Sequence, residues 1–301
     1  IWQKIIEDAP RASGFAQTNE FGAIAILMGL MCFAGLLQAW EPSKWRLKGI
    51  FLSGLLLFGA LNGITASILS GSRGAWLALL PAILIGLWVA WRATYTRAYL
   101  LAGFVLVFLA VSTAYISPAT GVASRITDAF QEMDEYIDDD VVGISVGYRI
   151  EMWKGALELF AEKPYVGWGE IAYTREMKEL GEVGSIDPKA SQFTHAHNEW
   201  LNVLAKKGLI GGIVLFGLYI TPLIWFVWLS YRSTADEHSN QSRFALATAG
   251  MAFSSGFVAT GMTQVSFNHN VGVMVYVFMI AVLVGMLTSN HWHKDAGVEP
   301  T

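Results

Sequence analysis

The stretch GLIGGIVLFGLYITPLIWFVWLSY, residues 208–231, contains no Asp, Glu, Lys or Arg. A helix needs about 20 predominantly apolar residues to cross the hydrocarbon core of a bilayer. In lipid the backbone polar groups have no water to bond with, so a helix, which satisfies them internally, is the favoured conformation of such a run. This stretch therefore predicts a transmembrane helix.

Similar uncharged runs occur along most of the chain. Only 15% of its 301 residues are charged and 54% are hydrophobic, with a mean hydropathy of +0.44. Soluble domains carry about 25% charged residues, so a soluble globular protein is excluded. The sequence predicts an all-α polytopic membrane protein with about seven transmembrane helices. They cover residues 22–40, 49–70, 74–91, 98–116, 209–230, 244–262 and 271–288.

The short connectors indicate an orientation. If the spans alternate, the connectors at 41–49, 92–97 and 231–243 fall on one side, and all three carry Lys or Arg. Short basic loops mark the cytoplasmic side of a membrane. Residues 117–207 and the turn at 263–270 then face the other side, which is the periplasm if the membrane is a bacterial inner membrane.

The spans divide the chain into three expected parts. Residues 1–116 form a periplasmic entry segment and four transmembrane helices. Residues 117–207 form a large, partly helical periplasmic loop, and residues 208–301 form three transmembrane helices and a short cytoplasmic tail. The chain begins at Ile1 inside a polar segment, and we expect it to be N-terminally truncated, with further spans upstream.

The large loop carries helix and turn signals. In YRIEMWKGALELFAEKP (148–164) the apolar residues recur at helical spacing, and Pro164 is expected to end the helix. The following YVGWGE predicts a turn. A second helix is expected to begin with Ser191 or Thr194 as its N-cap and to end at Gly208.

The acidic run EMDEYIDDD (132–140) is the densest cluster of charge in the loop. Its carboxylates can hold a divalent cation, but such runs are typical of solvated surface segments, and this one would repel a diphosphate. We therefore leave it out of the expected site and expect no metal and no cofactor. The sequence has no basic stripe that would bind nucleic acid.

His195 and His197 are the strongest candidates for chemistry. With Thr194 as N-cap they lie in the first helical turn, where the positive potential disfavours a charged imidazole and attracts phosphate. A neutral imidazole beside an anion site suits a transferase whose donor carries a diphosphate. His197 is the stronger candidate, His195 the more replaceable one, and one of the pair can serve only to orient the other. The alternative is an interfacial histidine that only hydrogen-bonds the loop.

Arginines on the same side are candidate anion ligands. Arg73 lies in a very short turn between two spans, where a cation normally faces a partner or a polar cavity; otherwise it anchors the hairpin by snorkelling. Arg149 can form a bidentate contact with phosphate or a salt bridge with Glu151. Arg11 is a weaker candidate.

Polar residues on that side can line an acceptor pocket. Asn198 follows the histidines, and Gln264 and His269 lie in the turn TQVSFNHN (263–270). All of them can equally be ordinary interfacial polar residues.

Three stretches together resemble the bacterial O-antigen ligase family. They are SGSRGAWLALLPAILIG (70–86), the pattern YR…W…A…P…VGWG within 148–169, and HAHNEWLNVLAKKGLIGG (195–212). The resemblance lies in their order as well: an arginine in a short turn, a second arginine in a large loop, and His-Asn before the next span. The superfamily also contains O-antigen polymerases and protein O-oligosaccharyltransferases.

The resemblance implies a glycosyltransferase of the inner membrane. By similarity, it would move a sugar polymer from undecaprenyl pyrophosphate to the lipid A–core oligosaccharide at the periplasmic face. Arg73 and Arg149 would bind the pyrophosphate and His197 would be the base, without a metal and with inversion. This sequence differs from some members in having His195 two residues before His197.

Other activities stay open at this point. An O-antigen polymerase would use the same donor with a second lipid-linked chain as acceptor. A protein O-oligosaccharyltransferase would transfer to a protein. A small-anion transporter would place polar groups near the membrane midplane, whereas the polar candidates here gather on one side.

Overall fold

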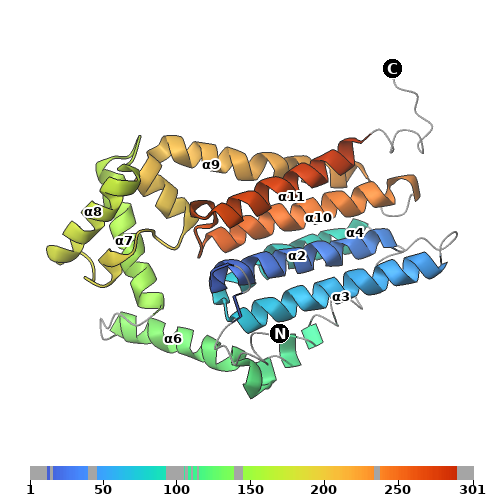
Figure 1. Cartoon of the computed structure of the whole chain (residues 1–301), viewed down its shortest axis with the longest axis horizontal. Helices are drawn as coiled ribbons and strands as arrows, with labels where there is room; N and C mark the ends of the chain where they lie inside the picture. The colour runs from blue at the N-terminus through green and yellow to red at the C-terminus, as the bar shows by residue number, and fades with distance from the viewer. Residues whose placement is uncertain are drawn as a thin grey trace. The chain divides into compact units, whose positions relative to one another are not determined.

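The computed structural model describes residues 12–13, 16–39, 46–92, 105, 108–109, 111–113, 115–138, 145–233 and 238–289. Within these ranges the regular structure is helical, with no strand. Six helices in the described part are long and apolar enough to cross a membrane. The prediction of an all-α polytopic membrane protein is therefore confirmed (Figure 1).

The chain divides into two compact units. We call residues 1–120, 220–260 and 270–301 the membrane unit, and residues 121–219 and 261–269 the loop unit. The long helices are α2 (Thr18–Ala39), α3 (Arg46–Ser70), α4 (Leu79–Arg92), α9 (Glu199–Arg232), α10 (His238–Gly261) and α11 (Asn270–Thr288). The loop unit adds α6 (Val122–Asp138), α7 (Val146–Glu162) and α8 (Gly169–Glu182). Short 3-10 turns are η1 (Arg73–Ala78), η2 (Pro118–Thr120), η3 (Ala190–Gln192) and η4 (Ser266–Asn268).

The spans predicted at 22–40, 49–70 and 271–288 agree with α2, α3 and α11 to within a few residues. Three starts differ: α9 begins at Glu199 and continues through a kink at Gly208, α4 begins at Leu79 after η1, and α10 begins at His238. The span expected at 98–116 lies largely outside the described residues. The other spans could be placed from the sequence because the length of each uncharged run matches the thickness of the hydrocarbon core.

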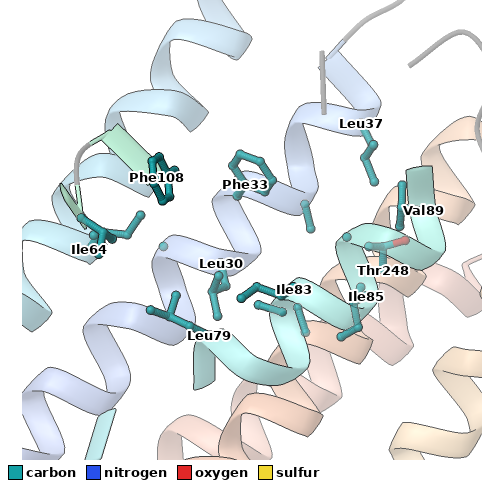
Figure 2. A pocket seen from close by; sticks show the side chains of 16 residues that line it. Leu30, Phe33, Leu37, Ile64, Leu79, Ile83, Ile85, Val89, Phe108 and Thr248 are labelled. Atoms are coloured by element: carbon teal, nitrogen blue, oxygen red, sulfur yellow. The ribbon is translucent and has the colours of Figure 1, made fainter. Parts of the chain in front are cut away.

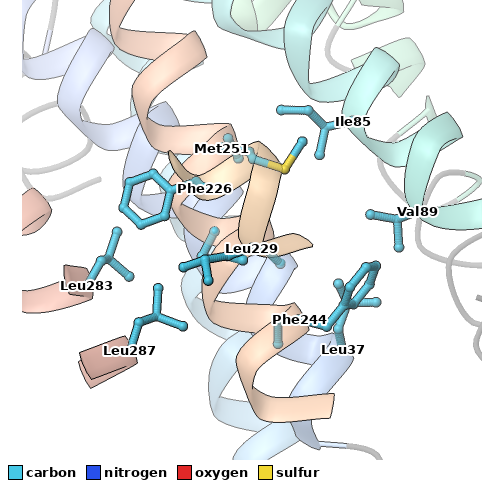
Figure 3. Packing of buried hydrophobic residues seen from close by; sticks show 14 residues of the cluster. Leu37, Ile85, Val89, Phe226, Leu229, Phe244, Met251, Leu283 and Leu287 are labelled. Carbon is cyan, nitrogen blue, oxygen red and sulfur yellow. The ribbon is translucent and has the colours of Figure 1, made fainter. Parts of the chain in front are cut away.

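Buried apolar side chains hold the membrane unit together. Leu37 from α2, Val89 from α4, Phe226 from α9, Phe244 from α10 and Leu283 from α11 belong to one cluster (Figure 3). The opposite faces of these helices expose large apolar side chains. Such exposure suits contact with lipid, where no polar surface is needed.

Small residues bring α2 and α3 into backbone contact. A Cβ added to Gly63 would lie 2.5 Å from the carbonyl oxygen of Ala25 and 2.7 Å from the Cα of Gly29. Packing of helices through glycine is common in membranes, because van der Waals contact replaces the hydrophobic driving force there.

The membrane unit also contains an apolar cavity of about 420 Å³ (Figure 2). Its lining side chains come mainly from α2 and α4, including Phe33, Ile83 and Val89. The hydroxyl of Thr248, which also lines it, donates to the carbonyl of Phe244 at 2.8 Å.

In the loop unit, α7 and α8 share a small core. Leu159 of α7 and Tyr173 and Met177 of α8 are buried together with Ala196 and Ala205. The helix expected at 148–164 is confirmed as α7, but α8 was not predicted from its Gly-rich, charged sequence. Gly155 explains the close packing, since a Cβ there would lie 2.8 Å from the sulfur of Met177.

Part of the acidic run has a structural role that the sequence did not indicate. Residues up to Asp138 belong to α6, and Glu132 Oε2 accepts hydrogen bonds from the backbone N–H groups of Ser145 and Val146 at 3.2 and 2.8 Å. Glu132 thus satisfies the free amides at the start of α7, a structural use of a carboxylate at a helix N-terminus.

Candidate functional site

The segment between η3 and α9, residues 193–198, carries both candidate histidines. Asn198 caps α9, because its Oδ1 accepts hydrogen bonds from the backbone N–H groups of Trp200 and Leu201 at 3.0 and 3.2 Å. The expectation that Ser191 or Thr194 is the N-cap is therefore wrong. The histidines lie in the loop before the helix, not in its first turn.

Two side chains fix this loop from outside. Trp153 Nε1 of α7 donates to the carbonyl of Ala196 at 2.9 Å. Lys206 Nζ, from the next turns of α9, donates to the carbonyl of Thr194 at 2.8 Å and to Glu170 Oε1 at 2.6 Å. Lys206 is only 2% exposed, whereas the Glu170 side chain is 58% exposed, so the ammonium is buried and its carboxylate partner reaches solvent. Neither tether was identified from the sequence.

The turn after α7 interlocks with a kink in α9. Gly208 has φ 64° and ψ −164°, which ends the first part of the helix as predicted. At this kink the N–H of Leu209 donates to the carbonyl of Pro164 at 2.7 Å, and the N–H of Trp168 donates to the carbonyl of Ala205 at 3.0 Å. A Cβ on Gly208 would lie 2.3 Å from the carbonyl carbon of Tyr165. The turn at VGWG and the kink at KKGLIGG therefore pack directly on each other, and we call this contact the joint at Gly208.

The loop brings three imidazoles together. The ring centroids of His195 and His197 lie 4.2 Å apart at an interplanar angle of 81°, and those of His195 and His269 lie 6.3 Å apart. The 261–269 segment is tied to α9, since the N–H of Phe267 donates to Glu199 Oε2 at 2.9 Å. Glu199 is 1% exposed, a buried carboxylate that the sequence did not single out.

His197 has an unusual backbone. Its φ of 48° is the only positive value among the described non-glycine residues. A side chain in this region costs about 1–3 kcal/mol, and such residues cluster at functional sites. The Nδ1 atoms of His195 and His197 are both buried and have no hydrogen-bond partner in the described part of the chain.

Both histidines are neutral near pH 7. Burial, followed by the charges of His195, Arg149 and His269, lowers the pKa of His197 to about 3. Burial and the Lys206 ammonium lower the pKa of His195 to about 4. The expected neutral state thus arises mainly from desolvation rather than from the helix N-terminus. Arg149, half-buried on α7, is close enough to act electrostatically on His197.

Two aromatic residues extend the row of rings. The Phe193 and His197 centroids lie 5.9 Å apart, and those of Tyr148 and Phe193 lie 6.4 Å apart. Phe193 is 38% exposed, whereas a phenylalanine in a protein core is usually buried. Its position two residues before His195 was the available signal in the sequence.

The structure brings His195, His197, His269 and Arg149 together in the loop unit. Gln264 is also in this unit; it is 8% exposed, and its Nε2 has no hydrogen-bond partner among the described residues. Asn198 serves as the N-cap. Arg73, half-buried at the start of η1, belongs to the membrane unit, and Arg11 lies outside the described residues.

A family profile described as O-antigen ligase matches residues 58–216, more than half of the chain. This chain belongs to the O-antigen ligase family. The matched range contains Arg73, Arg149, His195 and His197, so the joint and the histidine loop lie within the part of the chain that defines the family.

This O-antigen ligase family member is similar to two curated bacterial proteins. It is 26% identical to the exopolysaccharide production protein ExoQ of Rhizobium meliloti over 256 residues, 81% of this chain and 52% of that protein. It is 25% identical to an uncharacterized protein of Haemophilus influenzae over 174 residues, 57% of this chain and 43% of that protein. The chain thus spans about half the length of the curated relatives it matches.

Proposed function

We propose that this protein is a glycosyltransferase that moves a polysaccharide from undecaprenyl pyrophosphate to the lipid A–core oligosaccharide at the periplasmic face of the inner membrane. The observation that carries the proposal is His197: a half-buried, neutral imidazole on a strained backbone, beside Arg149, within the family-defining region. A base and a cation side by side suit a hydroxyl nucleophile and a diphosphate leaving group.

His197 acts as the general base in this reaction. It takes the proton of the acceptor hydroxyl while that oxygen bonds to the anomeric carbon of the donor sugar. The bond from that carbon to the diphosphate oxygen breaks, and undecaprenyl pyrophosphate leaves with the electron pair. Direct displacement inverts the anomeric carbon. General-base catalysis of this kind contributes about 10²–10⁴-fold to the rate.

Arg149 stabilises the charge that develops on the leaving diphosphate, and we assign Arg73 and the weaker candidate Arg11 the same role. A guanidinium binds phosphate oxygens in a bidentate manner, and the interaction strengthens as negative charge grows in the transition state. This role requires neither a metal nor a cofactor.

Donor binding also tunes the base. A diphosphate on Arg149 offsets one of the positive charges that lower the pKa of His197 and adds negative charge nearby. Both changes raise the pKa of the imidazole toward neutrality, where a general base is most effective. His195, whose ring is 4.2 Å away, orients His197, and Gln264 and His269 line the acceptor side.

An O-antigen polymerase is the second candidate, because one relative is named for exopolysaccharide production. In a polymerase the same base and arginines would act, but the acceptor would be another lipid-linked glycan.

Deleting the gene in a host that makes full-length lipopolysaccharide separates these functions. Loss of a ligase leaves full-length polymer on undecaprenyl pyrophosphate and unmodified core on lipid A. Loss of a polymerase leaves core capped with a single repeat, and an unchanged profile overturns both and favours a transporter. Complementing the deletion with the wild-type gene and with His197→Ala shows whether loss of His197 reproduces the deletion phenotype.

A further inference from the structure

Five rings in the loop unit are connected by successive ring contacts. In order they are Tyr148, Phe193, His197, His195 and His269, with successive centroids 6.4, 5.9, 4.2 and 6.3 Å apart. The rings come from three segments of the chain: α7, the 193–198 loop and the 261–269 segment. The imidazoles have a role in the proposed transfer, but the two aromatic rings at the Phe193 end have none so far.

We propose that Phe193 and Tyr148 form an aromatic platform on which a sugar ring of the acceptor stacks, with one of its hydroxyl groups directed at His197. This inference rests on the proposed function, which supplies the role of His197 as base. The ligand is a pyranose with an uninterrupted C–H face, carried on an oligosaccharide.

Exposure and position support a binding role for Phe193. Its side chain is 38% exposed, although it contacts both the tyrosine and the histidine ring. It is held in place by its backbone, since Phe193 is the C-cap of η3 and its N–H donates to the carbonyl of Ala190, the first residue of η3. An apolar ring kept partly open to solvent beside a polar cluster is a feature of ligand sites rather than of a packed core.

The chemistry of stacking favours a sugar. The π face of an aromatic ring is electron-rich, and the aliphatic C–H face of a pyranose is apolar and slightly positive, so the two attract. The hydroxyl groups of the stacked sugar project from the rim of its ring. The His197 ring is inclined at 67° to the Phe193 ring with centroids 5.9 Å apart, so a sugar stacked on Phe193 would lie close to the imidazole.

The acceptor fits this place better than the donor does. The hydroxyl that attacks must come within hydrogen-bond reach of the base, about 2.6–3.2 Å. Phe193 is the aromatic side chain in ring contact with His197 in the described part of the chain. The donor is held instead through its diphosphate, which the proposed function assigns to the arginines.

The test uses the full chain in nanodiscs, with core oligosaccharide released from lipopolysaccharide by mild acid as the binding probe. Binding is measured by saturation-transfer NMR and titration, and transfer to intact lipid A–core is measured separately. The variants are Phe193→Leu, which removes the π face, Phe193→Trp, which keeps it, and Tyr148→Leu. The matched control is Phe130→Leu, at a phenylalanine that is 69% exposed on α6 of the same unit.

We expect Phe193→Leu and Tyr148→Leu each to weaken oligosaccharide binding and raise the acceptor KM by about two- to tenfold, the usual worth of an aromatic contact. The kcat at saturating acceptor and the donor KM stay at wild-type values, Phe193→Trp restores binding, and Phe130→Leu behaves as wild type. A lower kcat with unchanged oligosaccharide binding would overturn the platform and leave Phe193 as packing for His197. A rise in donor KM alone would overturn it too.

The platform and the proposed function can fail separately. If the wild type binds the oligosaccharide through Phe193 but transfers nothing, the platform stands and the transfer reaction is wrong. If the wild type transfers and Phe193→Leu binds and transfers equally well, the function stands and the platform is wrong. Absence of any oligosaccharide binding by the wild type also overturns the platform.

Discussion

Two features of His197 destabilise the folded state. Its backbone lies in the left-handed region at φ 48°, and its Nδ1 is buried with no hydrogen-bond partner in the described part of the chain. An unsatisfied buried polar atom costs about 1–3 kcal/mol, and the backbone strain adds a similar amount. Residues that destabilise a fold in this way usually persist for function.

We predict that His197→Gly makes the protein more thermostable than His197→Ala. Glycine adopts a positive φ without steric cost, whereas alanine keeps the strain, so the two should differ by about 1 kcal/mol. Thermal unfolding in one detergent measures the difference, and both variants should lack transfer activity. Equal melting temperatures would show that the backbone of His197 is not strained.

The two neutral histidines predict a dependence of stability on pH. Their folded pKa values, about 3 and about 4, lie below the ordinary value of 6.5. Below pH 6.5 the unfolded chain therefore binds protons that the folded chain does not, and stability falls on acidification. The slope is about 1.4 kcal/mol per pH unit for each neutral histidine.

The melting temperature should therefore drop between pH 6.5 and 5 in the wild type and drop less in His195→Gln/His197→Gln. This double variant is the control for carboxylates, which titrate in both proteins. A decline of the same size in both proteins would mean that the imidazoles are not buried in neutral form.

At the scale of elements, α9 shows where sequence patterns were sufficient and where they were not. The break at Gly208 was predicted, because glycine favours positive φ at the end of a helix. The start was misplaced, because Ser, Thr and Asn are all good N-caps and only the fold selects Asn198. The tethers from Trp153 and Lys206 were missed, since a contact between distant segments leaves no periodic signal.

The joint at Gly208 gives a prediction at this scale. Gly208→Ala should destabilise the loop unit, because the new Cβ would lie 2.3 Å from the Tyr165 carbonyl carbon. Gly169→Ala is the matched control, since Gly169 has a similar φ of 74° with open space around its Cβ position. Limited proteolysis and melting curves should show a larger loss at Gly208. An equal loss of stability in both variants would show that the positive φ, and not the contact with Tyr165, causes the destabilisation.

At the scale of the whole molecule, the membrane class was predictable and the assembled site was only partly so. Uncharged runs of span length report directly on the bilayer, so six helices were placed from the sequence. Arg149 and the histidines were found as separate candidates, and their meeting in the loop unit depends on tertiary contacts. Phe193 was overlooked because one aromatic residue in a loop has no periodic pattern, and its position two residues before His195 was its only signal.

Labelling of single cysteines tests the predicted orientation. In a Cys32→Ala background, Gln192→Cys should react with a membrane-impermeant maleimide on cells whose outer membrane is permeabilised. Leu47→Cys, at a side chain that is 85% exposed near the basic 41–49 connector, should react only after the inner membrane is opened. The reverse pattern would place the histidine loop in the cytoplasm and contradict the proposed compartment.

The most direct measurement is the initial rate of glycan transfer by purified protein, from undecaprenyl-pyrophosphate-linked glycan to lipid A–core, in wild type and His197→Gln. Glutamine keeps a polar side chain of similar size but cannot accept the proton. We expect His197→Gln to transfer glycan about 10²–10⁴-fold more slowly, with donor binding retained. Transfer by His197→Gln at the wild-type rate would contradict it.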